Sequence, residues 1–103
     1  MNDATAAAAL SALGHETRLG LFRLLVRAGH EGLNIGQIGR HLGLAPSTLA
    51  HHLGALVEAG LVAQERRGRE VINVAAFDRL RAVLGYVTDE CCVGVTLTDD
   101  DAA

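Results

Sequence analysis

The chain has 103 residues, half of them apolar, with 12 glycines and a single proline, a composition typical of one small globular domain. This composition excludes a disordered chain or a collagen-like repeat. The longest apolar run is far shorter than the roughly 20 residues that a membrane span requires, and the alanine-rich start has no basic segment of a secretion signal. Its two cysteines, Cys91 and Cys92, are adjacent, so they do not form a disulfide framework across a fold. We therefore expect a cytoplasmic protein with reduced thiols and no membrane partner.

The net charge of −3 is unevenly distributed along the chain. Residues 15–74 contain seven arginines, five glutamates and all five histidines, whereas residues 75–103 contain two arginines and six acids. A mildly basic middle and an acidic end are compatible with nucleic-acid binding by the middle alone.

Four helices are predicted in the first part of the chain. Ala4–Leu13 favours a helix by propensity and ends at Gly14. Glu16–Arg27 is apolar nearly all round, which predicts a central, buried helix. Asn34 is a good N-cap for a short helix that ends near Leu42, before Gly43. A fourth helix starts at Pro46 or Ser47, presents a stripe of Leu49, Leu53, Leu56 and Val57, and ends at Gly60.

Two short strands and one more helix are predicted in the second part. Leu61–Arg66 and Glu70–Val74 favour a hairpin with Arg67, Gly68 and Arg69 at its tip. Apolar residues from Phe77 to Val87 predict a last helix that could continue to Cys91. The order α-α-α-α-β-β-α describes a mainly α domain with a small β-hairpin over residues 1–93. Residues 94–103 are expected to form an acidic, disordered tail.

The strongest functional signal is the pair of helices joined by a glycine-containing turn, because such a second helix can enter a major groove. Ser47, Thr48 and His51 lie away from the leucine stripe, where they can donate hydrogen bonds to phosphates or base edges. Any two packed helices give a similar pattern. The basic hairpin tip that follows favours DNA, although a solvated turn would have the same composition.

Four segments together resemble the ArsR/SmtB family of winged-helix, metal-responsive bacterial repressors. They are LSALGHETRL (10–19), LAPSTLAHHL (44–53), EAGLV (58–62) and RRGR (66–69). The resemblance implies a homodimer that binds double-stranded operator DNA and forms through the first and last helices. It implies that Ser47, Thr48 and His51 face bases and that His52 packs inside or binds backbone. The residues that it assigns to phosphates are Arg40, Arg66, Arg67 and Arg69.

Two sensing sites of that family are missing from this chain. The arsenic pattern that enters the third helix is Cys-x-Cys, whereas residues 33–38 read LNIGQI. The zinc pattern on the last helix needs histidines, and no histidine follows His52. Neither site is expected here.

Cys91 and Cys92 resemble the vicinal pair of an arsenic-responsive subgroup. Trivalent arsenic is thiophilic, so two thiolates are suitable ligands; the expected effector is arsenite or methylarsenite, with antimonite as a further candidate. Cys91 could instead extend the apolar stripe of Leu84 and Val87. Adjacent helical side chains point about 100° apart, so joint chelation requires the helix to end here, as Gly94 suggests. The third ligand is left open between water, another thiol and an organic substituent.

Acidic neighbours and the helix dipole disfavour free thiolates at this position, whereas a bound metalloid can displace the thiol protons. A redox-sensing repressor of the same fold is the main alternative. A small arsenic-handling thiol carrier or reductase is a second one, which the basic hairpin and the unactivated thiols disfavour. No phosphate loop, paired catalytic carboxylates or nucleophile elbow is present, so we expect no enzyme.

Overall fold

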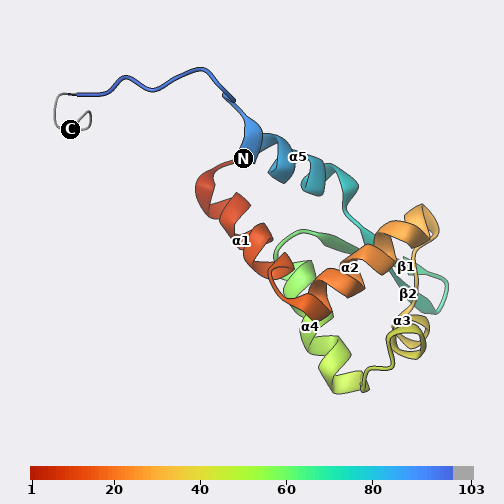
Figure 1. Cartoon of the computed structure of the whole chain (residues 1–103). Helices are drawn as coiled ribbons and strands as arrows, with labels where there is room; N and C mark the ends of the chain where they lie inside the picture. The colour runs from red at the N-terminus through yellow and green to blue at the C-terminus, as the bar shows by residue number, and fades with distance from the viewer. Residues whose placement is uncertain (99–103) are drawn as a thin grey trace.

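The computed structural model describes residues 1–98 and has the element order that the sequence predicts, as Figure 1 shows. A short 3₁₀ helix after the second helix is the one added element. The elements are α1 (Asp3–Leu13), α2 (Glu16–Ala28), η1 (Gly29–Glu31), α3 (Ile35–Leu42), α4 (Pro46–Glu58), β1 (Val62–Arg67), β2 (Glu70–Ala75) and α5 (Phe77–Thr88).

Local signals set the ends of the helices. The Asn34 side chain accepts a hydrogen bond from the Gln37 N–H, and the Gln37 side chain accepts one from the Asn34 N–H, which forms a capping box at the start of α3. Gly43 ends α3 in the left-handed conformation, with φ 67°. Pro46 then starts α4 at its first helical position. The helix-turn-helix therefore follows from residues that the sequence displays.

The core lies between α2 and α4. Leu21 and Leu25 of α2 and Leu56 of α4 are fully buried, and Leu49 and Leu53 are nearly so. The prediction that α2 is buried nearly all round was wrong, because Leu19 and Val26 are 44% and 38% exposed. One face of α2 packs on α1, α4 and the hairpin, and the other faces solvent.

The hairpin is antiparallel and in register from Val62 opposite Ala75 to Arg67 opposite Glu70. β1 begins and ends one residue later than predicted, and β2 ends one residue later than predicted. No sequence pattern indicated a third partner, yet Leu33 and Asn73 exchange backbone hydrogen bonds of 3.0 and 2.8 Å. This bridge fixes the hairpin to the segment that precedes α3.

Helices α1 and α5 lie near one another at the end of the molecule opposite the hairpin tip (Figure 1). The Tyr86 hydroxyl donates a hydrogen bond to the Asp3 carboxylate and joins the end of α5 to the start of α1. No helix within residues 1–98 has the length and apolar character needed to cross a bilayer.

The extension of α5 to Cys91 was wrong, because the helix ends at Thr88. The Thr88 hydroxyl bonds to the Leu84 and Gly85 carbonyls, a pattern that competes with regular helix geometry. Asp89 then adopts extended ψ (144°). Gly94, expected as the residue after the helix, lies beyond this point, and residues 94–98 form no regular secondary structure. The remaining five residues of the predicted acidic tail lie outside the described part of the chain.

Candidate DNA-binding surface and cysteine turn

The start of α4 presents the predicted polar side chains to solvent. Ser47, Thr48 and His51 are exposed, and they fall within one turn of each other on the helix. Leu49 and Leu53 point the other way, into the core. Burial of the leucine stripe therefore orients the polar face outward, which is the arrangement that major-groove reading requires.

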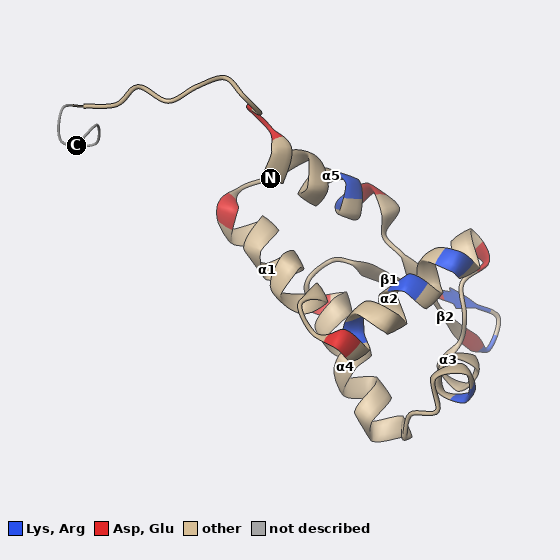
Figure 2. Cartoon of the chain, viewed as in Figure 1, with Lys and Arg blue, Asp and Glu red and all other residues tan. Residues whose placement is uncertain are grey.

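Arginines gather over α2, α3 and the hairpin, as the blue segments in Figure 2 show. Arg40 on α3, and Arg66 and Arg69 beside the hairpin turn, are exposed. Within residues 1–98, none of these three guanidinium groups takes part in an ion pair. They are free to bind phosphate oxygens.

Arg67 differs from the other three predicted phosphate ligands. Its guanidinium donates to the carbonyls of Glu31 and His30 at 2.8 and 2.9 Å and to the Glu65 carboxylate at 2.5 Å. These bonds link the hairpin to η1. Arg67 therefore supports the position of the hairpin, and a phosphate contact by this residue stays a prediction.

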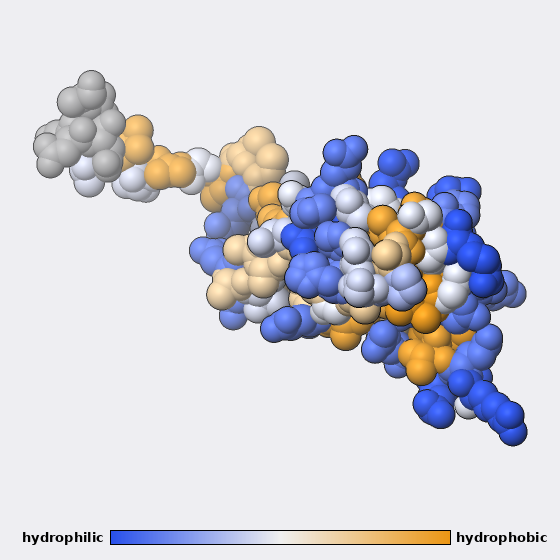
Figure 3. All heavy atoms as spheres, turned by 90° about the horizontal axis from the view of Figure 1, so that it is seen from below, coloured by the Kyte–Doolittle hydropathy of each residue, from blue (hydrophilic) through white to orange (hydrophobic). Residues whose placement is uncertain are grey.

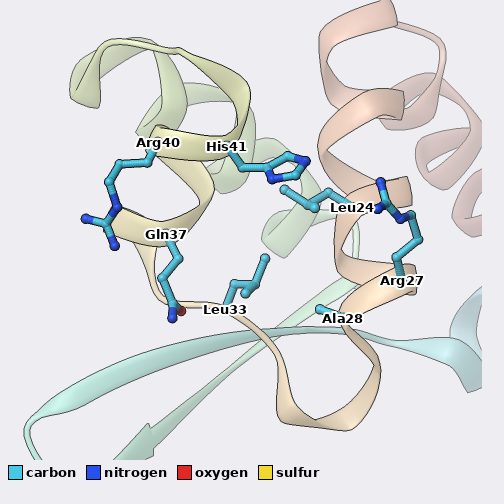
Figure 4. Close-up of a pocket in the computed structure, with 7 residues that line it drawn as sticks. All are labelled: Leu24, Arg27, Ala28, Leu33, Gln37, Arg40 and His41. Atoms are coloured by element: carbon cyan, nitrogen blue, oxygen red, sulfur yellow. The ribbon is translucent and has the colours of Figure 1, made fainter.

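A cavity of about 580 Å³ lies between α2 and α3 (Figure 4). Leu24, Ala28 and Leu33 contribute apolar surface, and the polar lining residues are Arg27, Gln37, Arg40 and His41. Arg40 extends away from the cavity in this view, whereas the His41 ring reaches toward Leu24. The outward direction of Arg40 suits a phosphate contact better than a ligand inside the cavity.

The buried His52 of α4 contacts two exposed histidines, His15 and His51. The ring of buried His52 lies 4.8 Å from that of His15 and 5.5 Å from that of His51, measured between centroids. This confirms that His52 packs inside, although the sequence did not predict its contact with His15, the N-cap of α2. The His52 Nδ1 is buried and has no hydrogen-bond partner within the described residues. Burial, followed by repulsion from His15, His51 and Arg18, lowers the pKa of His52 below its ordinary value of 6.5.

The two cysteines lie in a turn just after α5, which we call the cysteine turn (residues 89–92). Glu90 and Cys92 have φ of 62° and 65°, a region that residues with a Cβ rarely occupy. This backbone brings the Cys91 and Cys92 sulfurs to 3.0 Å from each other, and both residues are exposed. The helix period that would have separated the side chains no longer applies at this point. Two thiols therefore point to one place.

The hydrogen bond with Cys92 raises the pKa of the Cys91 thiol. From the acidic neighbours, the sequence predicted that the thiols are protonated. In the structure, the main cause of the raised pKa of Cys91 is its hydrogen bond with the Cys92 thiol. Within residues 1–98, no group of three or more histidine, cysteine and acidic side chains is placed to hold a metal ion. The cysteine turn alone therefore offers two ligands.

The comparisons with known proteins agree with this architecture. The family model "Helix-turn-helix domain" matches residues 13–65. An ArsR-like transcriptional regulator from Rhodococcus sp. RHA1 has a TM-score of 0.74 and 27% identity, over 82% of this chain and 76% of that one. A homodimeric winged helix-turn-helix DNA-binding domain from Mycobacterium bovis has a TM-score of 0.65 and 25% identity, over 95% and 97%. The chain belongs to the helix-turn-helix domain family and has the winged fold of ArsR-family DNA-binding transcriptional regulators.

One sequence relative is named for a response to arsenic. A candidate arsenical resistance operon repressor, ArsR, of Halobacterium salinarum is 40% identical over 60 residues. The match covers 58% of this chain and 46% of that protein. The similarity is thus confined to a part of each molecule.

Some residues that shape the surface gave little or no sequence signal. Asn73 is 1% exposed and accepts a hydrogen bond from Gln64 at 2.9 Å while its own amide donates to the Leu33 carbonyl. A polar residue within an apolar strand was the available signal for this buried network. Gly32, with φ 64°, lies so close to β2 that a Cβ would come within 2.5 Å of the Asn73 carbonyl oxygen. A glycine in a loop does not reveal such a contact, because the partner strand is distant in the sequence.

Proposed function

We propose that this protein is a homodimeric repressor that binds operator DNA in the cytoplasm and leaves it when trivalent arsenic binds Cys91 and Cys92. Ser47, Thr48 and His51 would contact base edges. Arg40, Arg66, Arg69 and, in addition to its structural bonds, Arg67 would contact phosphates. The effector would be arsenite or a methylated arsenite, with antimonite as a further candidate.

DNA binding is supported by two groups of exposed side chains that lie on neighbouring elements and suit different parts of the DNA. The exposed start of α4 carries hydroxyl and imidazole groups that can bond to base edges. Three exposed arginines lie on α3 and beside the hairpin turn, where they can position the helix against the backbone. Positioning and reading therefore come from neighbouring but different elements, as in other winged-helix proteins.

A homodimer is supported by the apolar surface of α1 and α5. Leu10 of α1 and Leu84 and Val87 of α5 are 43%, 54% and 58% exposed. Leu10 and Val87 line the same hollow between the two helices, and exposed apolar residues that gather in one place usually mark a protein interface. A two-fold axis through these helices would place two α4 helices on one palindromic site.

Arsenic binding is supported by one observation above all, the 3.0 Å approach of the two sulfurs beyond the end of α5. The two cysteines are suitable ligands for trivalent arsenic, because their sulfur atoms are soft, exposed and directed to one place. Bound arsenic would supply a bond that holds the two thiolates together. The third position would be taken by water, another thiol or the methyl group of a methylated arsenical.

The position of the cysteine turn gives a route to the DNA-binding surface. The turn begins at Asp89, three residues after Tyr86, whose hydroxyl bonds to Asp3 at the start of α1. A change in the turn would thus act on the contact between the two proposed dimer helices. Moving these helices would change the spacing of the two α4 helices and weaken operator binding.

A redox switch is the second candidate, since two thiols in contact are also placed for oxidation. Oxidation by peroxide proceeds through the thiolate, and the raised pKa of the Cys91 thiol reduces the thiolate fraction. A metalloid that displaces the proton on binding is less affected. The pKa direction therefore favours arsenic over peroxide.

The test is operator release, measured by fluorescence anisotropy on a duplex from the promoter of the protein's own operon. Arsenite should weaken wild-type binding by about 5- to 150-fold, the usual range of allosteric coupling. Cys91→Ser and Cys92→Ser should bind the duplex normally and fail to respond. Ala8→Ser, an exposed position of α1 outside the groove against α5, serves as the control. Release of both cysteine variants at the wild-type arsenite concentration would refute the site. Release by peroxide without a response to arsenite would favour the redox switch.

A further inference from the structure

The described part of the segment after the cysteine turn is apolar and exposed. Val93, Val95 and Leu97 are 75%, 83% and 61% exposed. They alternate with Gly94 and Thr96, so an arm that is fully extended when it docks places all three side chains on one side. In this structure Gly94, with φ 99°, interrupts the extended backbone. The segment runs clear of the rest of the molecule in Figure 1, and apolar atoms follow it in Figure 3. A one-sided row of this kind is typical of a segment that is covered by a partner.

A matching groove of about 510 Å³ lies between α1 and α5. Its apolar lining comes from Ala6, Ala7 and Leu10 on one side and from Tyr86 and Val87 on the other. Asp3, Asp89 and Glu90 also line it, so that its acidic residues belong to the start of α1 and the residues after α5. The small alanine side chains leave room for an added chain.

The segment can be compared with the groove in length and in charge. Residues 93–97 span about 16 Å when extended, and the part of α1 that lines the groove, from Asp3 to Leu10, spans about 12 Å as a helix. The groove is therefore long enough to cover about three quarters of the row. Residues 93–97 contain no charged side chain, so the segment itself brings no unpaired charge into the groove.

The segment starts beside this groove, since Asp89 and Glu90 line it, but then runs away from its own α1 and α5. In a dimer formed through the same helices, the partner's groove would lie next to this starting point. We propose that residues 93–97 of each protomer form an arm that occupies the α1–α5 groove of the second copy. This inference rests on the homodimer of the proposed function. It places the cysteine turn at the base of the arm, so that arsenic binding acts directly on the dimer.

Sedimentation equilibrium on the full chain tests the arm with two adjacent substitutions of equal charge. Val95→Asp, on the apolar side of the arm, should raise the dimer dissociation constant by at least about tenfold, since one buried apolar side chain is lost from each of two arms. Thr96→Asp, on the other side, should leave it within about twofold of wild type. No effect of Val95→Asp, or equal effects of both, would overturn the proposal.

A cross-link distinguishes exchange between chains from folding back within one chain. In a Cys91→Ser and Cys92→Ser background, Ala7→Cys combined with Val95→Cys should oxidise to a covalent dimer. An intramolecular monomer product would overturn the exchange. If Val95→Asp stays dimeric and binds operator, only the arm is wrong. If the wild-type chain is monomeric while it binds operator, both the arm and the proposed homodimer are wrong.

Discussion

The two ends of the molecule differ in how many of their polar and apolar side chains have partners within one chain. At the end formed by the hairpin, α3 and the start of α4, buried Asn73 has its polar groups bonded, and Arg67 ties the hairpin to η1. At the end formed by α1, α5 and the cysteine turn, Leu84, Val87 and the segment from Val93 are exposed. At the first end, the bonds that hold the surface in position are made within one chain. In the proposed homodimer the second end would be covered by another molecule, and an effector bound at the cysteine turn would act there.

The largest expected effect is on the free energy of unfolding, and it tests how closely the loop before α3 packs against β2. Gly32→Ala should lower the free energy of unfolding by about 3 kcal/mol or more, since it combines a left-handed backbone with overpacking. The new Cβ would meet the Asn73 carbonyl oxygen at 2.5 Å and the Ile72 and Val74 side chains at 2.6 and 2.8 Å. Urea unfolding followed by circular dichroism measures the loss.

Gly29→Ala is the matched control for this prediction. Gly29 also has positive φ, 68°, but a Cβ at this position would have no neighbouring atom within 4 Å among the described residues. It should therefore lose only the backbone contribution, about 1–3 kcal/mol. Equal losses for the two variants would mean that the close approach of Gly32 to β2 does not constrain the hairpin.

The next effect concerns the charges of the first end. Arg66→Ala combined with Arg69→Ala should reduce the slope of log affinity for operator against log salt by about 0.9 for each phosphate that is no longer neutralised. Arg81→Ala, which removes an exposed arginine paired with Asp78 on α5, should leave the slope unchanged. A smaller slope for the Arg81 variant would mean that α5 contacts the DNA, which would contradict the proposed DNA-binding surface.

The smallest effect is a dependence of stability on pH. The pKa of His52 is lowered in the folded chain, so the unfolded chain binds a proton below about pH 6.5 that the folded chain does not. The free energy of unfolding should therefore fall as pH decreases from 7 to 5, and this contribution is fully present above pH 6.5. Denaturant titrations across this range should show a shallower fall for His52→Gln. The exposed His41→Gln control should retain the wild-type slope, and an unchanged slope for His52→Gln would contradict the prediction.

The sequence predicted those parts of the structure that depend on neighbouring residues. The Asn34 cap, the Gly43 turn and Pro46 define the helix-turn-helix, because capping and turn preferences act over a few positions. The exposed face of α4 followed from the leucine stripe. In contrast, the Leu33 bridge to Asn73 and the contact of His15 with His52 join distant segments. No local pattern encodes such pairs.

The candidate effector site was predicted in composition but not in geometry. The adjacent cysteines indicated the ligands, and the helix period correctly required an end to the helix before they could converge. The position of that end was missed, because the Thr88 hydroxyl bonds and the positive φ of Glu90 and Cys92 are properties of the folded turn. The spacing of Leu84 and Val87 indicated an apolar stripe, and both residues are more than half exposed in the structure. A sequence pattern does not tell what covers such a stripe.

The central claim is that the cysteine turn and the DNA-binding surface are energetically coupled, and binding linkage tests this most directly. The arsenite affinity of the protein is measured by isothermal titration calorimetry with and without saturating operator duplex. We predict weaker arsenite binding in the presence of operator, by the same factor, about 5- to 150-fold, by which arsenite weakens operator binding. Equal arsenite affinity in the two titrations would contradict this coupling.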